Sequence, residues 1–182
     1  SMHNLALVYM RAGRLDQAQA TIMEALKSYE AKLGPDHPST LRAMAQLEAV
    51  LENQKDYAQA DALSRKRLAR TRHRDGPGSA ALADALDGVG NTFLQRHQWA
   101  QTESILRESL AIRERLHPND RRTFWTRSEL GRALLGQGRL AEAEPLIEAD
   151  GAGVRRAREH QLEQLGQDLA VRLDELGVDA LD

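Results

Sequence analysis

The sequence contains no cysteine, few aromatic residues and no long apolar run, and each of these absences excludes a class of protein. Without cysteine there is no disulfide, no thiolate nucleophile and no cysteine-ligated zinc. Aromatic residues make up only 4% of the chain, so a large aromatic core is not expected. No apolar run approaches the roughly 20 residues of a membrane-spanning helix, and no signal-peptide pattern opens the chain. These absences favour a soluble, cytoplasmic location.

The composition is that of a folded helical protein. Charged residues make up 29% and hydrophobic residues 41% of the 182 residues, and the net charge of −2 argues against nucleic-acid binding driven by bulk charge. Alanine, leucine and arginine, which favour helices, dominate over the strand formers valine, isoleucine and threonine. The chain is therefore expected to be all-α.

Similar stretches recur along the chain every 41 or 42 residues. Each stretch has a turn, then a large apolar residue, then a small residue three positions later; the stretches are "AGRLDQAQATI" (12–22), "QKDYAQADALS" (54–64), "RHQWAQTESIL" (96–106) and "QGRLAEAEPLI" (137–147). So regular a period indicates an array of structural repeats.

Between these turns lie connectors rich in glycine and proline: "KLGPDHPST" (32–40), "RDGPGSAA" (74–81) and "RLHPNDRRT" (115–123). Glycine and proline end one helix there, and Ser39, Ser79 or Asp120 is expected to cap the next. Each repeat is therefore interpreted as two antiparallel helices. Small residues such as Gly90 and Gly131 in the first helices are expected to let two helices approach closely.

This pattern resembles the tetratricopeptide repeat, and the long period with the connector "LGPDHPST" resembles its kinesin-light-chain subtype. The stretch "NDRRTFWTRSELGRALLGQGRLAEAEPLI" (119–147) also resembles tetratricopeptide tails of bacterial serine/threonine protein kinases, so a larger parent protein could carry a kinase domain. The resemblance implies a right-handed α-solenoid of four helix pairs in an array over 1–161, with repeats at about 1–36, 37–78, 79–119 and 120–161. A capping helix and tail are expected over 162–182.

The sequence departs from the repeat pattern in places. Glu48 and Arg67 occupy positions where a small residue and alanine are usual, and Asp150-Gly151 predicts a soft point. Leu5, Val8 and Tyr9 need cover that no earlier cap provides, so the chain is expected to be a fragment of a longer one.

No catalytic, metal or cofactor site emerges from the residues. The six histidines form no i, i+4 pair, and His37 and His117 precede prolines in connectors, where a turn role is expected. "GVGNTF" lacks the lysine of a phosphate loop. The chain is expected to be non-catalytic, without cofactor or metal.

A ligand is expected on the first helices, because in tetratricopeptide proteins these line a concave groove that commonly holds an extended peptide. Asn4 matches an asparagine that clasps peptide backbone in the kinesin-light-chain subtype. Trp125 could anchor a partner or pack between neighbouring first helices. The residues expected in the groove are Asn4, Arg11, Arg42, Gln46, Asn53, Asp84, Asp87, Asn91, Gln95, Trp125, Glu129 and Arg132.

The function predicted is therefore a non-catalytic adaptor or regulatory module that binds a peptide segment of a protein partner. One alternative is a homodimer formed through the uncovered first repeat. A second alternative is nucleic-acid or phosphate binding through the basic run "RKRLARTRHR" (65–74). The run spreads over more than one helix face and lacks interleaved aromatic residues, so a solvated helix end is the simpler interpretation.

Overall fold

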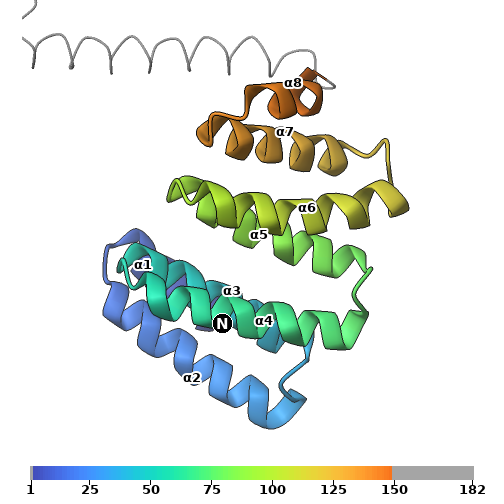
Figure 1. Cartoon of the computed structure of the whole chain (residues 1–182). Helices are drawn as coiled ribbons and strands as arrows, with labels where there is room; N and C mark the ends of the chain where they lie inside the picture. Colours follow the sequence, from blue (N-terminus) through green and yellow to red (C-terminus); the bar gives the residue numbers. More distant parts are fainter. Residues whose placement is uncertain (1, 149–182) are drawn as a thin grey trace, which may run out of the picture. The chain divides into compact units, whose positions relative to one another are not determined.

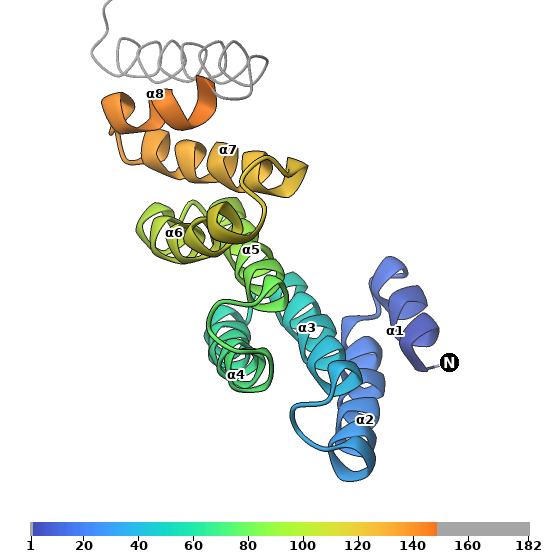
Figure 2. The ribbon, with the colours of Figure 1, turned by 90° about the vertical axis from the view of Figure 1, so that its right-hand side faces the viewer.

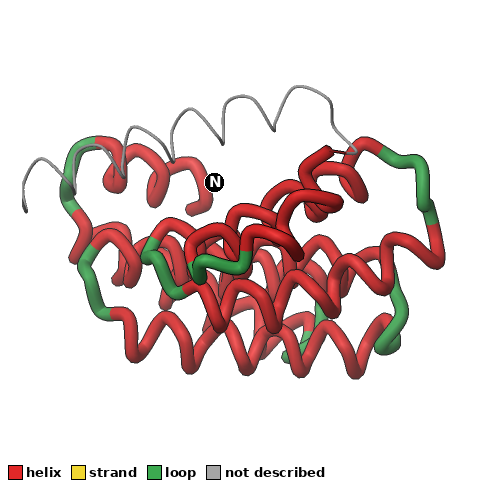
Figure 3. The backbone as a smooth tube through the Cα atoms, turned by 45° about the horizontal axis from the view of Figure 1, so that its top comes forward, coloured by secondary structure: helices red, strands yellow, loops and turns green. Residues whose placement is uncertain are grey.

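The computed structural model describes residues 2–148, which form eight α-helices and no strand (Figures 1 and 3). The all-α class predicted from the sequence is confirmed. The capping helix expected over 162–182 and the soft point at Asp150-Gly151 lie outside the described residues. The helices are α1 (Met2–Arg11), α2 (Leu15–Leu33), α3 (Pro38–Asn53), α4 (Tyr57–Asp75), α5 (Ala80–Gln95), α6 (Trp99–Leu116), α7 (Arg121–Gly136) and α8 (Leu140–Glu148). No described helix is both long and apolar enough to cross a membrane.

The chain divides into two compact units, Ser1–Val89 and Gly90–Asp182. In the first unit α2 packs against both α1 and α3, and α3 packs against α4 (Figure 2). Its core includes Ala18 and Ile22 of α2 with Leu47 and Val50 of α3. In the second unit α7 packs against both α6 and α8. The core of that unit is a cluster of apolar side chains: Leu106, Leu110, Leu130, Leu134, Ala143 and Ile147.

The turns inside the four helix pairs share one backbone conformation. The second turn residue has a positive φ in every pair: Gly13 (69°), Lys55 (63°), His97 (57°) and Gly138 (74°). The residue after it donates its N–H to a carbonyl five positions earlier, as Arg14 does to Tyr9 (2.9 Å) and Arg139 to Leu134 (2.9 Å). These are Schellman motifs, which satisfy the last carbonyls of the first helix. The turns therefore establish which positions of the four repeats are equivalent.

Buried threonines stabilise two of the connectors by hydrogen bonds to backbone carbonyls. Thr40 and Thr123 are both 0% exposed, and their hydroxyls donate to the carbonyls of Gly34 (2.8 Å) and His117 (2.6 Å). Asp120 caps α7 by accepting from the Arg122 N–H, and Ser79 accepts from the Leu82 N–H at the start of α5, as predicted.

The predicted cap at Ser39 is wrong. Pro38 occupies the first position of α3, so the cap moves one residue earlier, and His37 Nδ1 accepts from the Ser39 N–H at 3.1 Å. His37 therefore has the turn role that the sequence predicted.

Two glycines allow the close helix approach that the sequence predicted. A Cβ added to Gly90 of α5 would lie 2.4 Å from Leu106 Cδ2 of α6, and one added to Gly131 of α7 would lie 2.4 Å from Ile147 Cγ1 of α8. Both distances are too short for any side chain. In contrast, a Cβ added to Gly88 of α5 would meet nothing within 4 Å.

Two single substitutions in α5 are expected to change stability in opposite directions. Gly90→Ala should destabilise the protein, because overpacking costs about 1–3 kcal/mol and exceeds the gain of up to about 1 kcal/mol in helix propensity. Gly88→Ala, two residues away and unhindered, should stabilise it by about 0.5–1 kcal/mol. Urea unfolding measures both free energies. Equal shifts for the two variants would contradict the close approach at Gly90.

Candidate functional site

Each first helix of the second, third and fourth pairs exposes side chains at equivalent positions, which are together called the stripe. Arg42 of α3, Asp84 of α5 and Trp125 of α7 are equivalent by their distance from the turns, and all three are exposed. About three helical turns further along, Asn53 of α3 and Gln95 of α5 are also equivalent and exposed. The stripe is polar apart from Trp125, so each first helix presents a mainly hydrophilic surface beside its buried face.

In the first unit the predicted residues fall into exposed and buried groups. Arg11 and Arg42 are exposed, Gln46 is half-buried, and the exposed Asn53 donates its amide to the Ala49 carbonyl (2.7 Å). The side chain of Asn4 lies outside the described residues.

The two aspartates of α5 in this unit differ. Asp84 is exposed, whereas Asp87 is only 6% exposed and therefore offers little surface to a ligand.

In the second unit Trp125 is the large apolar member of the stripe. It is 40% exposed, although Leu130 and Leu134 of the same helix are buried. Arg132, two turns after Trp125, is exposed and donates to both carboxylate oxygens of the buried Glu129 (3.0 and 2.8 Å). Asn91 is half-buried and Gln95 exposed. The stripe can thus offer an indole face, a guanidinium and amides.

Within residues 2–148 no cluster of histidine and carboxylate side chains could hold a metal ion. The Glu129 carboxylate is already compensated by Arg132. The side chains of the stripe offer hydrogen bonding, ion pairing and apolar contact.

The two departures in the second repeat compensate each other. Glu48 of α3 and Arg67 of α4 are 8% and 9% exposed, and the Arg67 guanidinium donates two hydrogen bonds to the Glu48 carboxylate (2.7 and 2.8 Å). A buried charge needs such a partner. The sequence carried a signal of this pairing, since both departures fall in one repeat with opposite charges.

The remainder of the basic run is largely engaged within the first unit. Arg70 Nη1 donates to Glu30 Oε1 of α2 (2.7 Å) and to the Pro35 carbonyl (3.2 Å), and Arg74 Nη1 donates to the Asp36 carbonyl (3.3 Å). These contacts tie the end of α4 to the connector before α3. They give the run a structural role that needs no ligand.

A polar network joins α6 to the turn between α7 and α8 in the second unit. Glu103 is 7% exposed and accepts from Gln137 Nε2 (2.7 Å) and from Arg139 Nη1 (2.7 Å to each oxygen). Burial alone would raise the pKa of Glu103, but the hydrogen bonds from Gln137 and Arg139 and the nearby charges outweigh it and lower the pKa. The ionised carboxylate therefore stabilises this joint.

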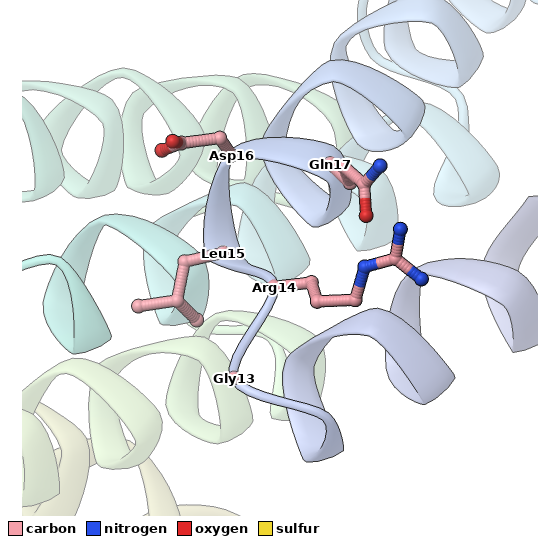
Figure 4. A pocket seen from close by; sticks show the side chains of 5 residues that line it. All are labelled: Gly13, Arg14, Leu15, Asp16 and Gln17. Carbon is pink, nitrogen blue, oxygen red and sulfur yellow. The ribbon is translucent and has the colours of Figure 1, made fainter.

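A pocket of about 330 Å³ lies at the turn between α1 and α2 (Figure 4). Gly13, Arg14, Leu15, Asp16 and Gln17 line it. The Arg14 and Gln17 side chains point to one side of the turn, whereas Leu15 and Asp16 point to the other. Leu15 packs against the core of the first unit.

Removing one partner of the buried Glu48–Arg67 pair is expected to reduce the stability of the fold more than replacing both partners with apolar residues. Arg67→Ala should destabilise the protein by about 3–5 kcal/mol, because it leaves a carboxylate buried without its partner. The double variant Glu48→Leu, Arg67→Met should be near the wild type or more stable. Lys66→Ala, on the exposed side of α4, is the control, with a change within about 0.5 kcal/mol. A double variant less stable than Arg67→Ala would contradict this account.

The Glu103 network predicts acid sensitivity. Because the pKa of Glu103 is lower in the folded state, its contribution is present above the unfolded value of about 4.3 and is lost as the pH falls through the folded value. Thermal melts of the wild type and Glu103→Gln, taken from about pH 6 to about pH 3, should therefore show melting temperatures that converge at low pH. Glu24→Gln, exposed on α2, is the control. A difference in melting temperature between wild type and Glu103→Gln that stays constant over this pH range would contradict the prediction.

Comparison with known proteins agrees with this architecture. The sequence profile of the family described as "Tetratricopeptide repeat" matches residues 1–73 and 81–149. The structure is similar to that of BtubC (BKLC) from P. vanneervenii, with a TM-score of 0.70, 21% identity and 86% of this chain covered. This chain spans 61% of the length of that BtubC chain.

The structure is also similar to nearly identical TPR-like repeats of a putative kinesin light chain from Podosopora anserina. The TM-score is 0.72 at 19% identity, covering 96% of this chain and 95% of the other, and the Q17M form gives 0.73 at 19% identity, covering 97% and 95%. At these identities the likeness concerns the fold alone. No curated protein gives a significant match, and the resemblance to kinase tails stays a prediction. The chain belongs to the tetratricopeptide-repeat family, with a fold of the kinesin-light-chain type that generally serves protein–protein interaction.

Proposed function

We propose that the chain is a non-catalytic interaction module that binds an extended peptide segment of a protein partner along the exposed stripe of its first helices. The observation that carries this proposal is Trp125, an indole 40% exposed on a helix that buries its leucines. Exposed tryptophan is costly to leave in water and is among the residues most enriched at binding hot spots.

The polar residues of the stripe suit a peptide main chain. An extended peptide presents unpaired N–H and C=O groups at regular intervals, and amide side chains can both donate to and accept from them. Gln95 and Asn53 are exposed for such contacts, and Arg42 and Arg132 add donors for carbonyls or carboxylates. The concave groove predicted from the sequence is the surface that we propose these residues line.

A selection from a random peptide library displayed against the chain tests this function. Peptides selected on the wild type should lose at least about 30-fold in affinity for Trp125→Ala, which corresponds to the hot-spot threshold of about 2 kcal/mol. Leu116→Ala is the matched control, since Leu116 is 38% exposed on the second helix α6 of the same unit. Its affinity should change by less than about twofold.

Thermal melts must show that both variants remain folded. Equal affinities of the selected peptides for wild type and Trp125→Ala would contradict the proposed surface, as would an equal loss for Leu116→Ala.

A further inference from the structure

Gly88 is a helix-interior glycine for which neither backbone conformation nor packing gives a reason within the described residues. It lies in the middle of α5, where glycine lowers helix stability more than any residue except proline. Its backbone φ is not positive, and a Cβ added to it would meet nothing within 4 Å. Gly90, two residues later, is different, because its close approach to Leu106 requires a glycine.

Equivalent positions in the neighbouring repeats carry long side chains. Counted from the turns, Gly88 corresponds to Gln46 of α3 and to Glu129 of α7. The repeat fold therefore accepts a long side chain at this position, and α5 is without one. Gly88 is exposed and follows Asp84, a residue of the stripe, by about one helical turn. An exposed glycine of this kind lets another molecule approach the main chain closely.

The charge of α5 indicates which kind of ligand residue fits beside Gly88. Asp84 is exposed, and α5 contains no lysine or arginine. At the position of Asp84, α3 has Arg42 and α7 has Trp125. Residues four apart on a helix are neighbours, so Asp84 lies beside the bare main chain of Gly88. This combination suits a long cationic side chain, because its aliphatic stem can cover the glycine while its charged end pairs with the carboxylate.

We infer that Asp84 and Gly88 form a subsite, here called the α5 subsite, for an arginine or lysine of the bound peptide. The stem of that residue lies over Gly88, and its terminal nitrogen donates to the Asp84 carboxylate. Both residues of the subsite belong to the first unit. The inference rests on the proposed function, since it assigns one residue of the peptide that we propose binds along the stripe.

Substitutions of increasing size at Gly88 test the subsite, and the probe is the set of library peptides selected on the wild type. Gly88→Ala should weaken their binding by less than about threefold and Gly88→Gln by at least about tenfold, because only the longer side chain occupies the place of the cationic stem. Urea unfolding should show neither variant to be less stable than the wild type, since both improve helix propensity. Ala69→Gln, exposed on α4 of the same unit, is the control and should change the affinity by less than about twofold.

A charge exchange tests the pairing with Asp84. The selected peptides should contain an arginine or lysine whose replacement by methionine lowers the affinity for the wild type by about tenfold. Asp84→Lys should weaken binding of the original peptide by about tenfold, and a peptide with glutamate in place of the cation should recover the loss on that variant.

Three results would overturn the α5 subsite. The first is an equal loss of affinity for Gly88→Ala and Gly88→Gln, because it would show that the glycine serves helix flexibility and not access. The second is unchanged affinity for Gly88→Gln, and the third is an Asp84→Lys chain that binds the original peptide normally. If Trp125→Ala still loses affinity in the second or third case, the proposed function stands without the subsite. Normal binding by Trp125→Ala with a loss for Gly88→Gln would contradict the role of Trp125 and support the subsite.

Discussion

A two-helix hairpin has more apolar surface than its own helices can cover, and the rest of this structure depends on how neighbouring helices cover it. In the first unit α2 lies against α1 and also against α3, so Ala18 and Ile22 reach Leu47 and Val50 of the following hairpin. In the second unit α7 is covered from both sides, by α6 and by α8. Because the buried faces look toward neighbouring helices, the remaining side of each first helix is free to carry polar residues and Trp125 at no expense to the core.

The turns keep this arrangement in register. A first helix that ended one residue later would rotate its partner by about 100° and move every apolar residue off the shared face. The same positive-φ residue and the same hydrogen bond recur in the four turns, including those where Lys55 and His97 adopt a conformation that glycine adopts more easily. Packing of the flanking helices therefore overrides the local preference of these two residues.

The sequence was sufficient to predict what is periodic. Turn positions, helix pairing and the close approach at Gly90 and Gly131 all follow from residue types that recur every 41 or 42 residues. What the sequence did not predict depends on contacts between residues far apart in the chain. The pairing of Glu48 with Arg67 is one example, and the use of Arg70 against Glu30 and Pro35 is another. The His37 cap was missed for a local reason, since Pro38 displaced it. For the candidate site, the groove positions implied by the resemblance included the exposed Arg42, left Trp125 open between exposure and packing, and did not anticipate the burial of Asp87 and Glu129.

Polar contacts at the turns distinguish one helix joint from another. Apolar faces of alanine and leucine fit many partners equally well, so they hold helices together without selecting among them. In the first unit Gln54 donates hydrogen bonds to Gln19 and Asp16. At the equivalent place in the second unit, Gln137 and Arg139 donate hydrogen bonds to Glu103. An α6-like helix placed on α3 would bring its glutamate toward Gln54 and Asp56, without the arginine that compensates it on α7. A mismatch of buried charge of this kind discriminates against wrong partners more strongly than loss of apolar contact does. A few polar positions beside the turns thus distinguish the helix joint of the first unit from that of the second.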